Sequence, residues 1–299
     1  MFFLTDCDKT LVHYENGNTN HMSDDYITLP SSSGSGKIGY VHRETISLLN
    51  DISNNVESII CCSGMRTSTM LQRRSYFPSI SFWITENGGR IHEVKKHNNT
   101  NESYVEEIIE WKDYLLSDNH NFQKLIQLQS DLVSSGWDVD GIKMDQNECF
   151  TSNNDITNTN TNYLTMIRIK NSKEKNKDIS NILPLISPTL KYSFNLGYLD
   201  VYLPNSGKLK SSQWLMRHIR KRKEHNYDNN TYTYFFMGDD DNDIEIADNS
   251  TKAFIVEPCS ESMKLYINEN IHTNKIVLSN KTYHEATINL LQIIHSLLE

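Results

Sequence analysis

Two aspartates near the start of the chain are spaced so that they could act together on one ligand. Asp6 and Asp8 directly follow the apolar residues 2–4, which predict a short buried strand. Open α/β sheets place their ligands at the carboxyl ends of such strands, and a spacing of two residues sends both side chains the same way. Two carboxylates in one small site need a cation, or one of them must hold a proton. The pattern therefore predicts a hard divalent cation, Mg²⁺ foremost, and a phosphorylated ligand.

A second acidic segment lies in the final third of the chain. Residues 232–237 are apolar and aromatic and predict a strand, which is followed by the run GDDDND at positions 238–243. The alternating aspartates are also typical of a calcium loop. An EF-hand loop beginning at Asp239 would need glycine at its sixth position and glutamate at its twelfth, where this chain has Ile244 and Ser250. The spacing therefore does not favour an EF-hand.

Both segments resemble motifs of the haloacid dehalogenase (HAD) superfamily of phosphohydrolases. The pattern Asp6-x-Asp8-x-Thr10 after an N-terminal strand resembles motif I, and GDDDND resembles motif IV, written GDxxND. The resemblance implies that Asp6 is a nucleophile that forms an aspartyl-phosphate. It implies that Asp8 is the general acid and base of the reaction.

The same resemblance implies a Mg²⁺ site and one substrate contact in motif IV. Asp239 would bind the metal directly, and Asp243 would complete or support the site. Asn242 would bind nearby polar groups, those of the substrate included. The expected metal site therefore consists of four aspartates, namely Asp6, Asp8, Asp239 and Asp243.

A serine and a glycine between these segments fit the HAD order of motifs. Ser63 and Gly64 follow a strand predicted over residues 57–62 and resemble motif II, where a hydroxyl binds a phosphoryl oxygen. Arg66 comes next and is a candidate substrate-binding residue. A small hydroxyl before a helix is more often an N-cap, so only the order of the motifs favours phosphate binding here.

A lysine before the helix predicted over residues 211–223 resembles motif III, whose lysine neutralises phosphate and pairs with the nucleophile. Lys208 follows a glycine, as in many HAD proteins, but the usual K-G-x-A run is absent. We expect Lys208 to bind phosphate. Lys210, two residues further on, and a plain surface lysine are the alternatives.

The Asn-Gly pair at positions 87–88 predicts a hairpin between apolar runs. It also resembles the ENG segment of type II HAD proteins, where the chain leaves the core for a cap, and Asn87 is thereby a candidate substrate-binding residue. The implied fold class is α/β: a Rossmann-like core with a parallel sheet plus an inserted α/β cap domain of the C2 type, subtype C2B. The core would comprise residues 1–90 and 199–299, and the cap residues 91–198.

Apolar spacing predicts further elements along the chain. In the core we expect a polar, turn-rich segment over residues 13–40, helices over 43–53 and 282–298, and strands over 80–85, 254–256 and 275–278. In the cap we expect helices over residues 105–116, 122–134 and 178–183, and strands over 163–169, 192–196 and 198–203. Arg168, Lys170 and Lys143 are cationic candidates for substrate selection, although most exposed lysines and arginines are only solvated.

Composition excludes several classes of function. The net charge of −9 and the lack of a dominant basic patch argue against nucleic acid as a partner, and the basic run 217–223 fits a solvated helix face. Five cysteines without a C-x-x-C pair give no support for zinc or disulfides and favour a reducing, cytoplasmic location. With no apolar run of membrane-spanning length, we expect no membrane partner.

The combined motifs predict a Mg²⁺-dependent phosphatase of the type II HAD class, which includes Cof-like and sucrose-phosphatase-like groups. The expected partner is a small phosphorylated metabolite, such as a sugar phosphate, because a cap over the site would exclude large substrates. One alternative is a sugar phosphomutase of the phosphomannomutase type, although GDDDND does not match its longer metal-binding segment. The other is a binding protein that kept the fold, against which the intact Asp6 and Asp8 argue.

Overall fold

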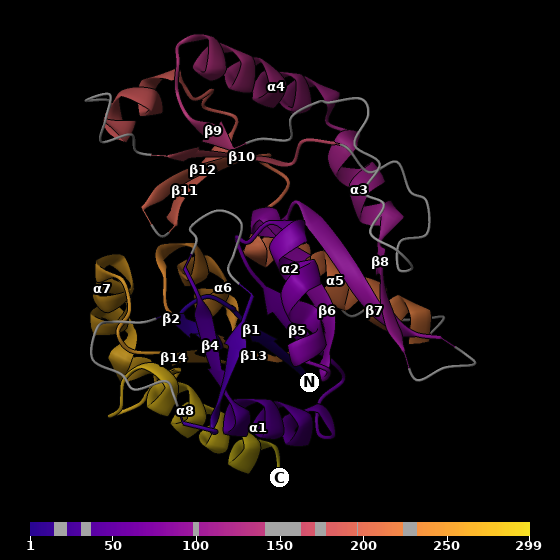
Figure 1. Cartoon of the computed structure of the whole chain (residues 1–299), viewed down its shortest axis with the longest axis vertical. Helices are drawn as coiled ribbons and strands as arrows, with labels where there is room; N and C mark the ends of the chain where they lie inside the picture. Colours follow the sequence, from indigo (N-terminus) through magenta and orange to yellow (C-terminus); the bar gives the residue numbers. More distant parts are fainter. Residues whose placement is uncertain are drawn as a thin grey trace.

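Helices on both faces of a large sheet, and a second sheet beside them, form this molecule (Figure 1). The computed structural model describes residues 1–14, 23–30, 37–97, 102–140, 163–170, 178–195, 197–223 and 232–299. Residues 31–36 of the predicted turn-rich segment and the cap candidate Lys143 lie outside these ranges. The α/β fold class predicted from the sequence is confirmed.

The large sheet has eight strands in the order β15-β14-β13-β1-β5-β6-β7-β8. Neighbouring strands from β15 to β6 run parallel, whereas β7 and β8 continue the sheet antiparallel. Their bounds are β1 Phe2–Thr5, β5 Ile59–Cys62, β6 Ile80–Thr85, β7 Arg90–Lys96, β8 Ser103–Glu107, β13 Tyr234–Gly238, β14 Lys252–Ile255 and β15 Ile276–Leu278. Because β1, β5 and β13 are adjacent and parallel, their carboxyl ends meet at one edge of the sheet.

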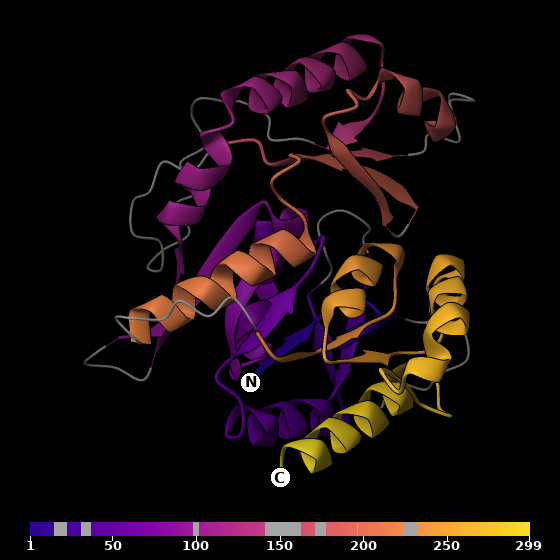
Figure 2. The same ribbon diagram turned by 180° about the vertical axis from the view of Figure 1, so that it is seen from behind.

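Alternate side chains of the strands form two separate cores, one on each face of the large sheet. On β1, Phe2 and Leu4 belong to one core and Phe3 to the other, as the two-residue period of a strand requires. Helices α1 (Arg43–Ser53), α2 (Thr67–Arg73) and α8 (Tyr283–Leu298) contribute to the core with Phe3. Helices α5 (Lys208–Lys223), α6 (Ile244–Asn249) and α7 (Glu261–Asn270) cover the opposite face (Figure 2).

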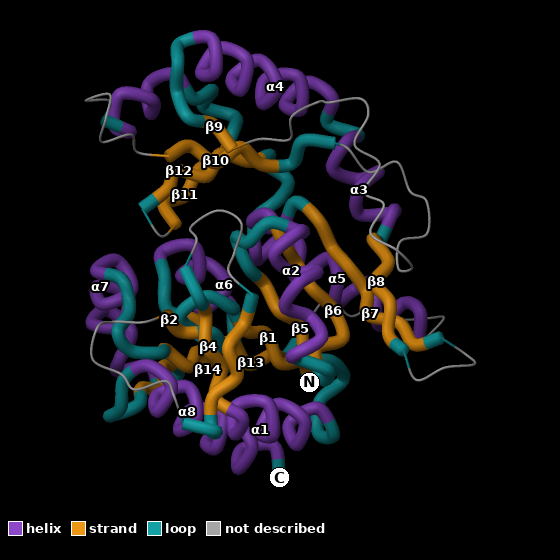
Figure 3. Tube along the Cα trace, viewed as in Figure 1, coloured by secondary structure: helices purple, strands orange, loops and turns teal. Residues whose placement is uncertain are grey.

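A second sheet, with the order β11-β12-β10-β9, lies apart from the first (Figure 3). It lies within a small lobe, residues 108–203, and the rest of the chain is the large lobe. The elements of the small lobe are α3 Ile109–Leu116, α4 Asn119–Ser134, β9 Val139–Asp140, β10 Met166–Lys170, the 3₁₀ helix η4 Ile179–Leu185, β11 Lys191–Asn195 and β12 Tyr198–Tyr202. The sheet lies between α4 and the large lobe (Figure 1).

The strand pairing shows where the chain passes from the large lobe to the small lobe and back. Residues 90–107 belong to the large sheet as β7 and β8, and residues 198–202 belong to the small sheet as β12. The strands thus divide between the two sheets near residues 108 and 203. The Asn-Gly turn joins two strands of the large sheet, and the domain boundaries at 91 and 199 stay predictions.

Two predicted segments have a different structure from the one expected. The segment 13–40, predicted to be turn-rich, contains β2 (His13–Tyr14), β3 (Tyr26–Leu29) and the start of β4 (Gly39–His42), which form a three-stranded sheet. These strands have only two to four residues, so no period can be recognised in them from the sequence. The helix predicted over residues 105–116 begins only at Ile109, because residues 103–107 pair with β7 as strand β8.

The remaining features of the fold agree with a compact core. Four cysteines, Cys7, Cys61, Cys62 and Cys259, are free and buried. Cys149 lies outside the described residues. Within the described ranges, no helix is both long and apolar enough to cross a bilayer.

Buried His92 on β7 predicts a measurable dependence of stability on pH. Burial, helped by the charge of Arg90, lowers the pKa of His92 from its ordinary value of 6.5 to about 3. Between these pKa values the unfolded chain binds a proton that the folded chain does not. The free energy of unfolding should therefore fall as the pH drops below about 6.5, by up to about 1.4 kcal/mol per pH unit from this residue.

Urea denaturation at about pH 6.5 and about pH 4.5 tests this expectation. The variant His92→Gln should lose less unfolding free energy over this interval than the unmodified protein. His120 is exposed on α4, so His120→Gln is the matched control and should behave like the unmodified protein. An equal loss in the His92→Gln variant would contradict the prediction.

Candidate active site

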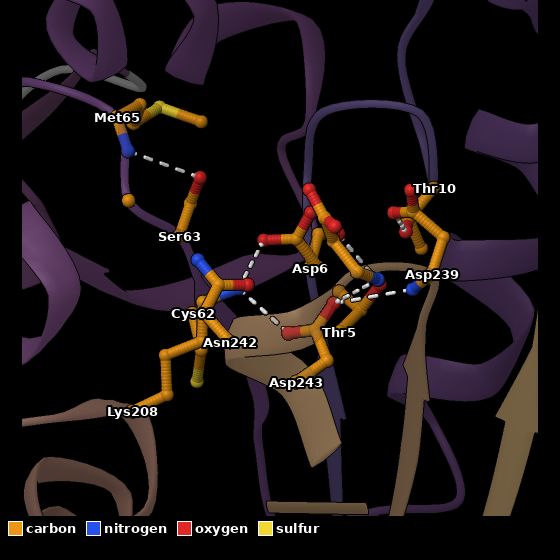
Figure 4. Close-up of polar contacts among 12 residues, drawn as sticks. Thr5, Asp6, Thr10, Cys62, Ser63, Met65, Lys208, Asp239, Asn242 and Asp243 are labelled. Carbon is orange, nitrogen blue, oxygen red and sulfur yellow. Dashed lines mark hydrogen bonds and ion pairs between the residues drawn. The ribbon is translucent and has the colours of Figure 1, made fainter. Parts of the chain in front are cut away.

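Three sequence segments meet at the carboxyl edge of the large sheet, where their polar side chains lie close together (Figure 4). Asp6 follows β1, Ser63 follows β5, and Asp239 follows β13. In Figure 4, Asp6 lies between Ser63 on one side and Asp239 on the other. The parallel order β13-β1-β5 brings these residues together although they are far apart in sequence.

Lys208 joins the acidic segments from the first turn of α5. Its Nζ donates to Asp6 Oδ1 at 2.8 Å, to Asp243 Oδ1 at 2.6 Å and to Asn242 Oδ1 at 3.0 Å. The residue is 4% exposed, so its ammonium depends on these oxygens instead of water. Lys210, the alternative, is exposed and donates to the carbonyl of Pro204 at 2.9 Å. The structure thus brings Lys208, and not Lys210, to Asp6.

Asp243 and Asp239 are fixed by the turn after β13. Asp243 Oδ2 accepts from the backbone N–H groups of Asp239 at 3.1 Å and Asp240 at 3.2 Å. Thr10, the last residue of the first motif, donates to Asp239 Oδ1 at 2.8 Å. A Cβ at Gly238 would lie 2.6 Å from Asp243 Oδ2, so the glycine is needed for this close approach.

The residues present fit a divalent cation. Asp6, Asp239 and Asp243 are buried and each offers one oxygen, with these oxygens within 4.8 Å of one another. When ionised, the three carboxylates and the Lys208 ammonium sum to a charge of −2. Oxygen ligands and a doubly negative site are what Mg²⁺ prefers.

Burial and the short distances between the carboxylates raise the pKa values of Asp6 and Asp239. Burial raises the pKa of Asp6 to about 7, although Lys208 opposes this shift. Burial and the charges of Asp6 and Asp243 raise the pKa of Asp239 well above its ordinary value. Carboxylates held so close together need a cation to remain ionised together.

Asp8 lies outside this carboxylate cluster. Arg73 Nη1 donates to Asp8 Oδ1 at 2.6 Å, and the Tyr14 hydroxyl donates to the same oxygen. Burial alone would raise the pKa of Asp8, but Arg73 and Tyr14 together lower it. Arg73 and Tyr14 hold the Asp8 carboxylate apart from the other three, and the predicted role of Asp8 as a metal ligand stays a prediction.

Comparison with known proteins yields a match in structure only. No family model matches the chain, and no curated protein matches it. A sugar phosphatase of HAD subclass IIB shares 15% sequence identity, with a TM-score of 0.60 over 100% of this chain and 99% of that one. A structure described in terms of a trigonal-bipyramidal intermediate in a phosphoryl-transfer superfamily shares 14% identity, with a TM-score of 0.58 over 100% and 99%. The sucrose-phosphatase of Synechocystis, in complex with sucrose and phosphate, shares 12%, with a TM-score of 0.55 over 98% and 97%.

The chain has the HAD fold. At these identities the likeness establishes the fold alone, and the chemistry must be argued from the residues of this chain. The HAD order of motifs was expected from the sequence, and its residues from the first, second, third and fourth motifs lie at one edge of the HAD core.

The residues of the second motif have different surroundings. Ser63 is buried, and its Oγ accepts from the backbone N–H of Met65 at 3.2 Å. The carbonyl of Gly64 accepts from Arg168 of the small lobe at 2.9 Å. Ser63 therefore lies beside Asp6 as expected, and Gly64 also contacts the small lobe.

Arg66, a predicted substrate-binding residue, bridges the two lobes. Its Nη1 donates to the carbonyl of Met166 at 3.0 Å and its Nη2 donates to the carbonyl of Asp140. The structure gives these donors backbone partners and does not bring Arg66 to the carboxylate cluster. Its role in substrate binding stays a prediction.

Asn87 links the site to the small lobe. Its Oδ1 accepts from Asn242 Nδ2 at 3.2 Å, and its Nδ2 donates to Asp200 Oδ2 at 3.0 Å. Because Asn242 also contacts Lys208, an unbroken chain of polar contacts runs from Asp6 to the small lobe. With a φ of 50°, Asn87 is in the left-handed region, where asparagine is tolerated better than most residues.

Sequence patterns missed three residues that shape the site. Tyr14 and Arg73 hold Asp8, and Asp200 pairs with Arg168 of the small lobe. Arg168 was expected as a cationic candidate for substrate selection, whereas no motif marks the other three. Each reaches the site through tertiary contacts, which single-sequence periodicity does not encode.

The turn that carries Asn87 is tightly packed against the start of α5. Gly88 has a φ of +86°, and a Cβ there would lie 2.5 Å from the carbonyl oxygen of Gly207, next to Lys208. Gly88→Ala should therefore lower the free energy of unfolding by about 2–4 kcal/mol, through backbone strain and the clash combined.

Gly197 provides a matched control, because its φ is +84° and a Cβ there would meet nothing within 4 Å. Gly197→Ala should cost only the backbone strain, about 1 kcal/mol. Denaturant titration of both variants measures the difference. Equal losses of unfolding free energy in the two variants would show that a Cβ at position 88 does not clash with Gly207.

Proposed function

We propose that this protein is a Mg²⁺-dependent phosphatase that hydrolyses a small phosphate ester through an aspartyl-phosphate on Asp6. One observation carries the proposal. Lys208 joins Asp6 to Asp243 within a buried cluster that also contains Asp239. Burying three carboxylates and one lysine costs desolvation free energy, which a bound ligand of suitable charge can offset. A divalent cation together with a phosphoryl group is such a ligand.

Asp6 would act as the covalent nucleophile in the first half of the reaction. A carboxylate oxygen of Asp6 forms a bond to phosphorus, and the bond from phosphorus to the ester oxygen breaks. Asp8 gives a proton to the departing oxygen. Lys208, at 2.8 Å from Asp6, would offset the repulsion between this carboxylate and the phosphate.

Asp8 would act as base in the second half. Water attacks phosphorus, its proton passes to Asp8, and the bond between phosphorus and Asp6 breaks to release inorganic phosphate. Arg73 and Tyr14 favour the ionised carboxylate of Asp8, which suits this step. For the first step Asp8 must begin protonated, so its contact with Arg73 has to loosen when substrate binds.

Asp6, Asp239 and Asp243 would hold the Mg²⁺ ion. When bound, the ion supplies positive charge that neutralises the phosphoryl oxygens. Ser63, buried beside Asp6, would donate its hydroxyl hydrogen to a phosphoryl oxygen.

The small lobe would act as the cap that limits the size of the substrate. It contacts the site through Asn87 and through Arg168, so a bulky phosphoprotein would have to displace these contacts. Two structural neighbours are named as a sugar phosphatase and a sucrose-phosphatase. Sugar phosphates are therefore the first substrates to test.

Removal of the nucleophile gives the most direct test. Asp6→Asn should lower turnover of p-nitrophenyl phosphate and of active sugar phosphates by about 10³-fold or more. Chelation of divalent cations should abolish turnover in the unmodified protein, and Mg²⁺ should restore it. Release of inorganic phosphate measures both effects, and an Asp6→Asn protein that retains turnover would refute the mechanism.

Lys208 and Lys210 form a matched pair for a second test. Lys208→Met should lower kcat by about 10²–10³-fold, because a preorganised cation is lost from the site. Lys210→Met should leave kcat within about two-fold, as expected for an exposed side chain. Steady-state kinetics on both variants decide which lysine acts, and equal effects would argue against the role of Lys208.

The same assays separate hydrolysis from phosphoryl transfer between sugar positions. A phosphatase releases inorganic phosphate in proportion to substrate consumed, whereas a mutase yields an isomeric sugar phosphate. Product analysis of an active sugar phosphate should show stoichiometric release of phosphate. Accumulation of an isomer without phosphate release would favour the mutase.

A further inference from the structure

One face of the small-lobe sheet is directed toward the active site. On β10 the buried Ile167 and Ile169 pack in the apolar core that includes α4. The intervening Arg168 contacts the large lobe at Gly64. Because side chains alternate along a strand, Lys170 lies on the same face as Arg168.

A buried carboxylate fixes the guanidinium of Arg168. Its Nε donates to Asp200 Oδ1 at 2.6 Å and its Nη2 donates to Asp200 Oδ2 at 2.7 Å. Asp200 is directly opposite Arg168 on β12 and is 0% exposed. Asn87 of the large lobe also donates to Asp200, at 3.0 Å, so this fork is anchored on both lobes.

The position of Arg168 relative to the reacting groups is defined by its contact with the large lobe. Its Nη2 donates to the carbonyl of Gly64 at 2.9 Å, which places it beside the predicted phosphate-binding loop. Lys208 binds the nucleophile Asp6 from the large lobe, whereas Arg168 reaches this loop from the small lobe. The small lobe would cover the alcohol part of a bound ester, so Arg168 would face that part.

The Nη1 group of Arg168 is available as a hydrogen-bond donor to a ligand. Among the residues that the structure describes, its Nη1 has no hydrogen-bond partner, and the side chain is 15% exposed. A guanidinium fixed on one edge presents its remaining N–H groups in a rigid plane, which suits carboxylate and phosphate oxygens. The pair with Asp200 is neutral overall, and Lys170 adds a positive charge to this face.

We propose that Arg168 binds a second anionic group, carried by the part of the substrate that leaves as the alcohol. The preferred substrates would then be phosphate esters whose alcohol bears a carboxylate or a second phosphate. Asp200 would be a positioning residue that aligns the guanidinium. This inference rests on the proposed function, because it assigns the substrate class of the same site.

Matched substrate pairs test the proposal and separate the two kinds of anion. Glycerol 3-phosphate and 3-phosphoglycerate differ by a hydroxymethyl group against a carboxylate, and fructose 6-phosphate and fructose 1,6-bisphosphate differ by one phosphate. In the unmodified protein kcat/KM should be at least about 10-fold higher for the anionic member of at least one pair. The pair that shows the preference identifies the group that Arg168 binds.

Variants at Arg168 provide the decisive comparison. Arg168→Gln should remove the preference, mainly by raising KM for the anionic substrate, so that kcat/KM becomes similar for the two members of the pair. Arg168→Lys should keep part of it, because the charge remains and the fork is lost. Asp200→Asn should weaken the preference in the same direction. Arg217, exposed on α5, gives the control Arg217→Gln, which should leave the preference unchanged.

A binding measurement keeps the test independent of turnover. In an Asp6→Asn background, calorimetry should show tighter binding of the preferred anionic ester than of its neutral partner, and Arg168→Gln should abolish the difference. An absent preference in the Asp6→Asn background, or an equal loss for both partners in Arg168→Gln, would overturn the proposal. Loss of all phosphatase activity with retained selective binding would instead count against the proposed function alone.

Discussion

Mutual neutralisation of buried charges is the constraint that organises the rest of this molecule. Asp6, Asp239 and Asp243 are each at most 5% exposed, and Lys208 is the cationic partner of Asp6 and Asp243. No one of them would be stable there alone, because an unpaired charge out of water costs several kcal/mol. The parallel strands β1 and β13 and the first turn of α5 must therefore stay in register for the core to remain folded.

The second aspartate of the first motif, Asp8, is held by residues from outside the acidic segments. Asp8 is two residues from Asp6, yet Arg73 and Tyr14 hold it apart from the carboxylate cluster. Tyr14 comes from β2 of the three-stranded sheet and Arg73 from α2, so two elements outside the acidic segments set the state of this carboxylate. Its role as acid in the proposed reaction therefore depends on movement, whereas its role as base does not.

Two arginines connect the lobes, and each donates hydrogen bonds from its own lobe to the other one. Arg66 of the large lobe donates to backbone carbonyls of the small lobe, and Arg168 of the small lobe donates to the Gly64 carbonyl of the large lobe. With Asn87 hydrogen-bonded to Asp200, these contacts connect the small-lobe sheet to the carboxylate cluster. The small lobe thus contributes side chains to the site and does more than cover it.

Local sequence determined the elements and the identity of the acidic groups. Helix 43–53 and strand 80–85 were placed at the observed bounds, because their apolar spacing has a single period. Asp6, Asp239 and Lys208 could be named because each directly follows an apolar strand or begins a helix. The three-stranded sheet within residues 13–42 was missed, since its short strands pair with one another and have little periodicity of their own.

Only the tertiary structure decided which side chains face which. It placed Lys208 on Asp6 and Lys210 on the surface, engaged Arg66 with backbone carbonyls, and brought Arg73 to Asp8 and Arg168 to Gly64. Such contacts depend on strand order and on the packing of α2, α5 and β10, and they join residues as far apart as Asp6 and Lys208, which are 202 positions apart. Sequence by itself fixes which groups are available for the chemistry, because it sets their types and local conformation. Their partners, and hence their charge states, follow from long-range packing.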